Sequence, residues 1–466
     1  MARHENDRVD RVVWFFPPTA LPELSDPVDH MWNPASKGYT LLVERAPSVH
    51  SKWAVRTLVG CLLFGLIVIF HDLPFSTSSS DPYTRCQSTA GKHTAVLGGV
   101  PGFLVLENVW YRNETFYVFN PDTSALPKED EVLSAPGTIV HASSVPAAIP
   151  DFCLKGSTLF LNENDRAGWS GLWHYYHFAA ENIVAGLATL ALAGIPGVPD
   201  QLIIPWDRRW HDRFGMNEMV VRGIWGLEFE AMWAPDDWDS YGREGENWGF
   251  FEKVAIIDRW VSHRKNPSAD RWNKMSLPIF EQNPPVGFFE SARQTLLETY
   301  EIRSPALSAP HVVYVDRQNT DRRLPNETHD ALLDLFAEFD HSGRVEFKHV
   351  VLEDLTPHEQ IETVAYADIM VGIHGNGLTH EMWMPARSTL IELFHPISFL
   401  RDYESIATAL GHSYYAVQND SILQREQWEA EPGERHAGMM HDGSTVYLDV
   451  EFFRSVLDDA LRRYQL

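Results

Sequence analysis

Hydrophobic positions in the second half of the chain occur in short runs that alternate with amphipathic stretches. Segments of strand length lie at residues 312–315, 345–352 and 367–373, of which the first and last are nearly all apolar, and the stretches between them, 330–339 and 357–366, are predicted helices. Such alternation is typical of βαβ units and predicts a parallel sheet. A last amphipathic stretch, residues 450–464, predicts a C-terminal helix with one apolar face.

The first half of the chain has fewer clear runs. Patterns typical of strands occur at residues 96–106, 115–119 and 201–204. A proline pair precedes a predicted helix at 288–299, and residues 304–310 have the composition of a linker. We therefore predict an α/β protein with a first domain at residues 95–300 and a second at 301–466.

One segment near the N-terminus is apolar enough to cross a membrane. Residues 53–70 are apolar except for Arg56, over a length just short of the roughly 20 residues that span a bilayer. Lys52 precedes the segment and Asp72 follows it, so the positive-inside rule predicts a type II orientation. We predict a cytoplasmic tail at 1–52, a signal anchor at 53–70 and a stem at 71–94. A cleaved signal peptide is less favoured, because its basic leader would be shorter.

Features beyond the predicted anchor are consistent with a secretory compartment. Three N-x-Ser/Thr triplets, at Asn113, Asn326 and Asn419, all follow the anchor and are candidate N-glycosylation sites. Of the three cysteines one lies within the anchor, which leaves Cys86 and Cys153 as a candidate disulfide. A short span favours a thin early-secretory membrane. We predict that the globular region is luminal, in the Golgi or the endoplasmic reticulum.

The net charge narrows the class of partner. A formal charge of -26 argues against nucleic acid, which is bound mainly through Lys and Arg, and disfavours an anionic membrane surface. An acidic balance can also mean only that the protein is soluble.

A glycine-rich turn is the strongest chemical signal. The sequence GIHGNG, residues 372–377, follows a predicted strand, and a helix is expected to begin near Leu378. Backbone N–H groups at such a turn form a site for a diphosphate, to which His374 could also donate. Glu392 ends the next predicted strand, where a carboxylate can accept from ribose hydroxyls. An ordinary tight turn between strand and helix is the alternative.

Three polar residues at helical spacing form a second candidate site. His174, His177 and Glu181 stand at i, i+3 and i+7, so they share one helix face. His177 or Glu181 could act as a general base toward a hydroxyl. The alternatives are a solvated face with a His–Glu pair, and a zinc site, although the spacing differs from that of H-E-x-x-H.

Arginines follow the first strand of the second domain. Arg317, Arg322 and Arg323 are expected at the carboxyl edge of the sheet, where they would offset pyrophosphate charge. Alternatively, they are surface residues paired with nearby acidic side chains. An Asp-x-Asp pair, 237–239, has the letters of a manganese site, but no apolar strand precedes it and we expect an acidic loop.

Three of these segments together resemble glycosyltransferase family 61. The resemblance lies in HGNGLT at 374–379, with Met384-Pro385 and Leu390-Ile391-Glu392 after it, in HYYHFAAEN at 174–182, and in RQNTDRRLPNE at 317–327. It implies a GT-B fold, in which two Rossmann-like domains face a cleft and the last helix crosses back to the first domain. Asn376 stands where the family usually has alanine.

The resemblance also implies a function. Family members are inverting transferases that use nucleotide sugars, so a donor such as a UDP-sugar of the xylose, N-acetylglucosamine or arabinose class and a glycan or glycoprotein acceptor are expected, with no metal or other cofactor. The rivals are a secretory glycosidase and a catalytically silent glycan-binding protein. His177 and Glu181 would be catalytic, and the donor would be bound by Arg317, Arg322, Arg323, His374, Gly375, Asn376, Gly377 and Glu392.

Overall fold

The computed structural model describes residues 92–464, except 136, 143, 146–149, 164–170, 227–231, 234–237, 239–246 and 431–444. The described residues belong to one compact unit. None of the helices in this part of the chain has both the length and the apolarity needed to cross a bilayer. The predicted tail, the predicted anchor at 53–70 and the stem up to residue 91 lie outside the described residues, so the anchor stays a prediction.

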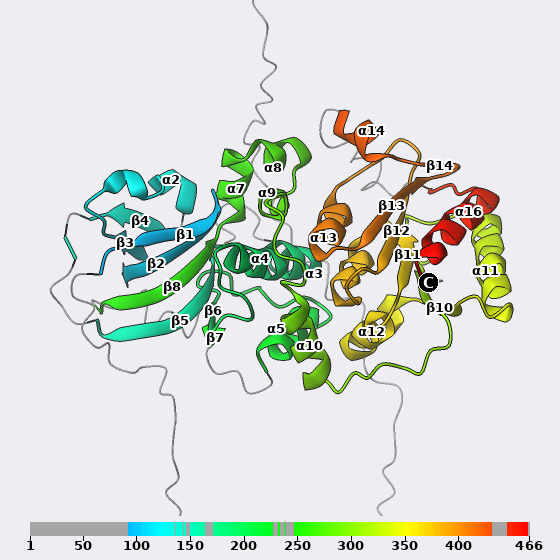
Figure 1. The fold of residues 1–466 in the computed structure, drawn as a ribbon, viewed down its shortest axis with the longest axis horizontal. Coiled ribbons are helices and arrows are strands. Elements are labelled where there is room, and N and C mark those ends of the chain that lie inside the picture. The colour runs from blue at the N-terminus through cyan, green and yellow to red at the C-terminus, as the bar shows by residue number, and fades with distance from the viewer. Residues whose placement is uncertain are drawn as a thin grey trace, which may run out of the picture. The chain divides into compact units, whose positions relative to one another are not determined.

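The first sheet contains eight strands in the order β4-β3-β2-β8-β5-β6-β7, with β1 also paired to β2 (Figure 1). β2 is antiparallel to β1, β3 and β8, whereas the pairs β8-β5, β5-β6 and β6-β7 are parallel. The strands are β1 (Ala95–Val100), β2 (Phe103–Arg112), β3 (Thr115–Val118), β4 (Thr138–His141), β5 (Phe152–Leu161), β6 (Gln201–Ile203), β7 (Met232–Trp233) and β8 (Gly249–Ile257).

This mixed arrangement differs from the mostly parallel sheet of a Rossmann-like domain. The run predicted as one strand at 96–106 is a hairpin, because Pro101 and Gly102 form a tight turn in which Gly102 has a φ of +82°. A second tight turn at Asn113 and Glu114, both with positive φ, joins β2 to β3. Two-residue connections allow only antiparallel neighbours, so these turns determine the direction of half the sheet.

The second sheet has six strands in the order β10-β9-β11-β12-β13-β14. All pairs are parallel except β13-β14, so the prediction of an α/β protein with a parallel sheet in this half is confirmed. The chain runs from β9 outward to β10 and returns to β11 on the other side of β9. The strands are β9 (His311–Val315), β10 (Glu346–Val350), β11 (Ile369–Ile373), β12 (Thr389–Phe394), β13 (Ser413–Gln418) and β14 (Ser421–Ile422).

Helices cover both faces of the second sheet because alternate strand residues point to opposite sides. Val312 and Tyr314 pack with α11 (Asn326–His341) and α16 (Val450–Leu461), whereas Val313 and Val315 pack with α12 (Pro357–Val364) and α13 (Asp402–Leu410). Figure 1 shows α11 and α16 together at the outer side of this sheet. The predicted helix at 330–339 therefore exists but begins four residues earlier.

Most of the remaining helices lie with the first sheet or between the sheets, whereas α14 (Arg425–Ala430) lies beside β13 and β14 (Figure 1). The predicted helix at 288–299 is α10 (Glu290–Thr299), and the histidine motif lies in α3 (Tyr175–Phe178) and in the π-helical segment η3 (Ala179–Val184), which continues into α4 (Ala185–Leu192). The others are α2 (Glu129–Val132), α5 (Met216–Trp225), α7 (Arg259–Lys265), α8 (Pro267–Trp272) and α9 (Leu277–Phe280), with short 3₁₀ segments at Thr123–Ala125, Leu352–Asp354 and Arg462–Tyr464.

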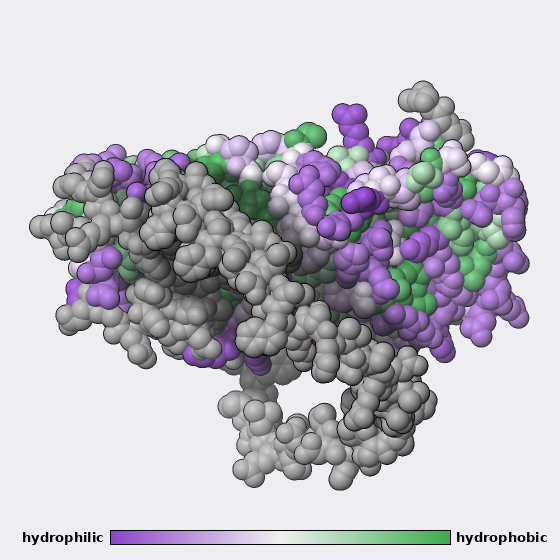
Figure 2. All heavy atoms as spheres, turned by 90° about the horizontal axis from the view of Figure 1, so that it is seen from below, coloured by the Kyte–Doolittle hydropathy of each residue, from purple (hydrophilic) through white to green (hydrophobic). Residues whose placement is uncertain are grey.

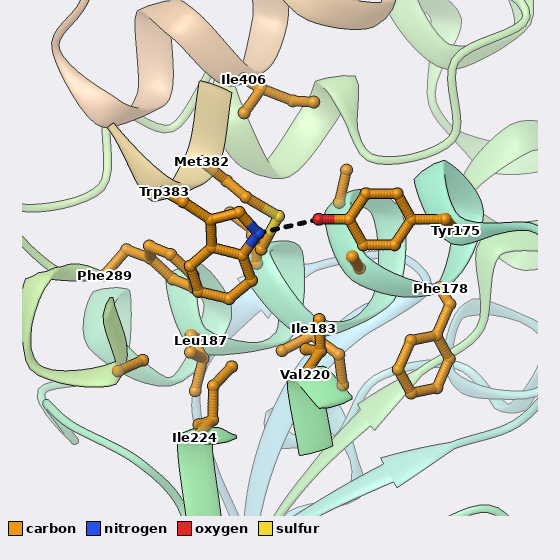
Figure 3. Close-up of a cluster of buried hydrophobic side chains, with 14 of the residues drawn as sticks. Tyr175, Phe178, Ile183, Leu187, Val220, Ile224, Phe289, Met382, Trp383 and Ile406 are labelled. Atoms are coloured by element: carbon orange, nitrogen blue, oxygen red, sulfur yellow. Dashed lines mark hydrogen bonds between the residues drawn. The ribbon is translucent and has the colours of Figure 1, made fainter. Parts of the chain in front are cut away.

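One hydrophobic cluster joins the two halves of the described chain. It contains residues of both sheets, of α3, η3 and α4, and of the 3₁₀ helix η6 (Asn376–Trp383). Figure 3 shows its centre, where Trp383 of η6 donates from Nε1 to the hydroxyl of Tyr175 in α3 at 2.8 Å and packs on Phe289. The two halves thus share a core, which fixes α3 against the turn that precedes η6.

The C-terminal helix does not cross to the first sheet, contrary to the expectation from the GT-B resemblance. The cluster that contains Phe453, Val456 and Leu457 of α16 has members only between Val312 and Leu461, so all of them belong to the second half of the chain. Arg454 of α16 also forms a bidentate pair with Glu338 of α11 at 2.7 Å. The apolar face of α16 is therefore buried against α11 and the second sheet.

Hydrophilic residues dominate the described surface on the second-sheet side in the view of Figure 2, with hydrophobic residues in small separate groups. The large hydrophobic residues that are exposed are scattered along the sequence. Among the described residues they are Val96, Val140, Trp173, Phe214, Val286, Ile397 and Tyr447.

Candidate active site

A pocket of about 410 Å³ lies where α3 meets the carboxyl ends of β9 and β11. The crossover from β9 to β10 and back makes the gap between β9 and β11 the switch point of the second sheet, which is where open α/β sheets bind ligands. The pocket is lined by His174, Tyr176, His177, Asn273, Lys274, Met275, Arg317, Arg322, His374, Gly375, Asn376, Asp402 and Tyr403.

Two arginines supply its positive charge. Arg317 and Arg322 each donate from Nη1 to the backbone oxygen of His374, at 3.1 and 3.2 Å. Burial and the neighbouring Arg322 lower the pKa of Arg317 below its ordinary value. Neither guanidinium has a carboxylate within ion-pair distance among the described residues. Two adjacent uncompensated cations create a site for an anion with several oxygens.

The nearby acidic residues do not neutralise these arginines, as the surface-pair alternative required. Asp316 instead lies 2.7 Å from His349 Nε2, and its other oxygen accepts from the Gln318 N–H at 2.6 Å. The alternative is therefore wrong for Arg317 and Arg322. Arg323, in contrast, is exposed and lies outside the pocket, so the predicted donor contact by Arg323 does not fit this geometry.

Glycine at position 375 is required by a close approach. A Cβ built on Gly375 would collide with the guanidinium of Arg317, and the residue also has a φ of +156°. Gly377 does not line this pocket but lines a smaller neighbouring one. The helix expected after the turn is η6, which begins at Asn376 and is 3₁₀ rather than α, so Gly375 and the arginines contribute more to an anion site than a helix dipole does.

Glu392 holds the ring of His374 in place. Its Nδ1 lies 2.5 Å from Glu392 Oε1, and the hydroxyl of Tyr414 donates to the other carboxylate oxygen at 2.5 Å. Burial raises the pKa of Glu392, while His374 and Tyr414 oppose the rise. Glu392 is fully buried with both oxygens occupied, so the predicted ribose contact does not fit. Its geometry is that of a residue that orients His374.

Asn376 connects the turn to the histidine helix. Its Oδ1 accepts from the backbone N–H of Tyr176 at 3.2 Å, 200 positions away, and from the Thr379 hydroxyl at 3.4 Å. Tyr176 is the second residue of α3, whose first N–H groups have no partner within the helix. Asn376, at the position where the resembled family usually has alanine, thus caps a helix from the other half of the chain.

His177 is oriented by a buried charge network. Glu181 Oε2 lies 2.7 Å from His177 Nδ1 and also accepts from Arg259 Nη1, and Glu163 accepts from the other side of Arg259 at 2.6 and 3.1 Å. Arg259 Nη1 also lies 3.1 Å from His177 Nδ1, but the contact with Glu181 is shorter and an ionised carboxylate can only accept. We therefore assign the proton to Nδ1 of His177 and the basic lone pair to Nε2. Arg259 is 1% exposed and both carboxylates are buried.

The network indicates which of His177 and Glu181 is the candidate general base, a choice that the sequence left open. Burial alone would raise the pKa of Glu181, but Arg259 and His177 lower it to about 2. Burial lowers the pKa of His177, partly opposed by Glu181, so the imidazole is neutral near pH 7. His177 lines the pocket whereas Glu181 does not. His177 is thus the candidate base, and Glu181 is a positioning residue.

His174 does not join a metal site with these two residues. Burial and the neighbouring His177 lower the pKa of His174 to about 4, and its ring centroid lies 4.9 Å from that of His177. Glu181 is already engaged by Arg259, and these three residues do not form a ligand-like group among the described residues. The zinc alternative is not supported.

The structure adds pocket residues that the sequence did not indicate. Lys274 follows α8 through the left-handed residue Asn273 and pairs with Asp402 at 3.2 Å. Lys274 and His374 lower the pKa of Asp402 against the effect of burial. Tyr403 packs its ring between Tyr176 and His374, with centroids 5.6 and 5.4 Å away. Isolated residues of common types carry no local signal, and only tertiary contacts bring them here.

The remaining predicted sites have mixed outcomes. Asn113 and Asn326 are exposed and Asn419 is half-buried, and their glycosylation stays a prediction. Cys153 is disulfide-bonded, but Cys86 lies outside the described residues and the pairing stays a prediction. Both aspartates of the 237–239 motif also lie outside.

A smaller pocket of about 120 Å³ adjoins the first at Arg317 and Asn376. It lies at the carboxyl ends of β9 and β10 and includes Leu352, Glu353 and Gln360. The two pockets together therefore follow the carboxyl edge of the second sheet.

The comparison with known proteins matches the part of the chain that supplies most of the pocket residues. Residues 175–391 match the family model described as Glycosyltransferase 61. The match includes His177, Arg317, Arg322 and the turn at His374, and it places the chain among the glycosyltransferases. This part of the chain is thus similar to glycosyltransferase family 61.

A more distant similarity points the same way. The chain is 24% identical over 185 residues to the EGF domain-specific O-linked N-acetylglucosamine transferase of Drosophila melanogaster. The overlap covers 39% of this chain and 34% of that protein, so the chain spans about a third of the length of this relative.

Proposed function

We propose that the protein transfers a sugar, with inversion, from a nucleoside diphosphate donor to a hydroxyl of a glycan or glycoprotein. The observation that carries the proposal is the pocket in which neutral His177 faces Arg317 and Arg322, two cations without carboxylate partners among the described residues. A base on one side and uncompensated positive charge on the other are what a single displacement at an anomeric carbon requires.

The donor would lie along the carboxyl edge of the second sheet. Its diphosphate contacts Arg317 and Arg322 beside Gly375, and His374 lines the same pocket with a ring that Glu392 holds in place. The smaller pocket beyond Arg317 receives the nucleobase of the donor. Charge from arginines, with Lys274 near, performs the neutralisation that a bound cation performs in other transferases, so transfer needs no metal.

In the transfer step the acceptor oxygen attacks the anomeric carbon from the side opposite the diphosphate. Its proton passes to Nε2 of His177, and the imidazolium formed is stabilised by ionised Glu181 across Nδ1. The bond between the anomeric carbon and the diphosphate oxygen breaks with both electrons leaving on that oxygen. Arg317 and Arg322 stabilise the negative charge that builds there.

Acceptors would approach from the side of α3. Trp173, next to His174, is 44% exposed and offers an aromatic face on which a sugar ring can stack. We place the reaction in the secretory lumen, with the chain held by the segment 53–70. The name of the Drosophila relative makes UDP-N-acetylglucosamine the first donor to test and EGF-like domains a first acceptor.

Glycoside hydrolysis is less favoured by the same pocket. A glycosidase needs two carboxyl groups that flank one sugar. Of the described residues that line the pocket, Asp402 is the one carboxylate, and it is paired with Lys274.

The test measures donor binding and transfer with matched arginine variants. Purified full-length protein is titrated with UDP and UDP-sugars by calorimetry, and transfer is followed with radiolabelled donors. Arg322→Ala is expected to lower kcat/KM by about 100-fold, because one donor to the leaving oxygen is lost. Arg323→Ala, which changes an exposed arginine one residue further along, retains wild-type rates.

Two outcomes would contradict the proposal. One is that no nucleotide or nucleotide sugar binds to folded protein. The other is that Arg322→Ala and Arg323→Ala behave alike.

A further inference from the structure

Three potential metal ligands meet on the other side of β9 from the donor pocket. Asp316 directly follows β9, His349 lies in β10 and His329 lies in the first turns of α11. Their ligand atoms all lie within 4.8 Å of one another. No step of the proposed transfer uses this group, and neither histidine lines either pocket described above.

Both imidazoles approach the same carboxylate oxygen. Oδ2 of Asp316 lies 2.7 Å from Nε2 of His349 and 3.3 Å from Nε2 of His329. Ligands at about 2.0–2.2 Å around a tetrahedral zinc ion stand roughly 3.3 Å from each other. The separations found here are therefore close to those of a metal site, and an ion could enter with small side-chain rotations.

The hydrogen bonds of His329 provide an independent indication. Its residue exposure is only 9%, and its Nε2 has no hydrogen-bond partner among the described residues although it faces Asp316. A buried imidazole nitrogen without a partner is costly, and a neutral lone pair directed at a carboxylate is repelled. A cation between the two groups would remove both penalties.

The surroundings favour binding without blocking access. The ring of Tyr314 stacks on His349 at 5.7 Å and lies 5.9 Å from His329, which limits how far either imidazole can turn. Asp330 lies 3.9 Å from Nδ1 of His329 and adds negative charge near the site. The His349 side chain is 36% exposed, so an ion can reach the site from solvent.

We propose that Asp316, His329 and His349 bind one divalent zinc-class ion, with water as the fourth ligand. Two imidazoles and one carboxylate suit zinc better than the oxygen-preferring calcium or magnesium. The ion would tie β9, β10 and α11 together and would hold the residue before Arg317. The proposal does not rest on the proposed transferase function, because the two histidines lie outside both pockets and Asp316 borders only the smaller one.

The experiment uses tag-free full-length protein stripped with a chelator and then exposed to limiting zinc sulfate. We expect one equivalent of zinc by mass spectrometry after desalting and a rise in Tm on zinc addition. Co²⁺ in place of Zn²⁺ is expected to give the visible absorption of a tetrahedral site. His349→Gln, at a partly exposed position, should weaken zinc binding by on the order of 100-fold or more, since even outer-shell changes cost 10- to 100-fold.

His341→Gln is the matched control, because His341 is an exposed residue in the last turn of the same helix α11 as His329. It should keep the full equivalent of zinc and the rise in Tm. His329→Gln should behave like His349→Gln. The proposal is overturned if wild-type protein takes up no zinc after stripping, or if His349→Gln and His341→Gln bind zinc equally. A plain His–Asp hydrogen bond would then account for the cluster.

Discussion

Arginines on the two sides of the pocket differ in one respect, which is whether carboxylates surround them. Arg259, at the start of α7 beside the first sheet, is buried between Glu163 and Glu181. Arg317 and Arg322, after β9 of the second sheet, share a backbone carbonyl and have no carboxylate partner among the described residues. Both sets of arginines are near the same histidine-lined pocket.

The difference separates a structural cation from a ligand-binding one. A buried guanidinium with two carboxylates has its charge satisfied within the fold, and its role is to hold Glu181 and so His177. Guanidiniums that donate only to neutral oxygens, here the His374 carbonyl and the Thr320 hydroxyl, retain most of their attraction for an external anion. Arginine content alone would not distinguish the two cases.

Of the substitutions that test this difference, removal of Arg259 is expected to have the largest effect, and the effect is on stability. Arg259→Met would leave Glu163 and Glu181 buried without a counter-charge, which costs about 3–5 kcal/mol in the free energy of unfolding. Urea denaturation followed by circular dichroism measures the change. Arg264→Met, at an exposed position in the same helix α7, should change stability by less than about 0.5 kcal/mol. Equal effects of the two substitutions would show that the network is not structural.

Changing Glu181 should affect rate and pH dependence more than stability. The base must be neutral, so kcat/KM falls as the pH drops through the pKa of His177, which burial lowers below its ordinary value. Glu181 raises that pKa, so in Glu181→Gln the acid limb should move to lower pH. We expect kcat/KM at its plateau to fall by about 10- to 100-fold, because the imidazolium loses its ionic partner.

Full pH–rate profiles of wild type and variant decide this point. Glu181 would be the base itself if the acid limb vanished rather than shifted. His177→Gln provides the reference, since it should abolish the limb and most of the activity.

The smallest expected effect tests the link between the two regions. Asn376→Ala removes the acceptor for the Tyr176 N–H and should cost about 0.5–1.5 kcal/mol, seen as a lower Tm and a few-fold weaker donor affinity. Calorimetry with the donor and a thermal scan measure both. No change in either would mean that the turn and α3 are held together by the apolar core alone.

Local patterns predicted the second sheet well and the first poorly. β9 lies where a run of apolar residues indicated, and the turn at Gly375 is placed as predicted, because parallel strands buried on both faces have a continuous apolar pattern. The hairpin of β1 and β2 reads as one run because the tight turn at Pro101 and Gly102 interrupts few apolar positions. Strand direction depends on such turns.

The site was predictable where one segment supplied it. His177, Arg322 and His374 each belong to a recognisable local motif, whereas Lys274 and Asp402 reach the pocket only through long-range packing. The structure differs from the prediction for Arg323 because the pattern does not show which of two adjacent arginines faces the pocket. The burial of Glu392 depends on Tyr414 of β13, which lies 22 residues further along the chain and outside the motif.

The hydrogen bond between Trp383 and Tyr175 sits in a core that both halves of the chain build together. A polypeptide cut near residue 300 would expose half of that core on each fragment, so neither fragment would remain soluble as an independent binding module. The residues proposed to bind the donor, Arg317 and Arg322, and the candidate base His177 therefore depend on one shared core.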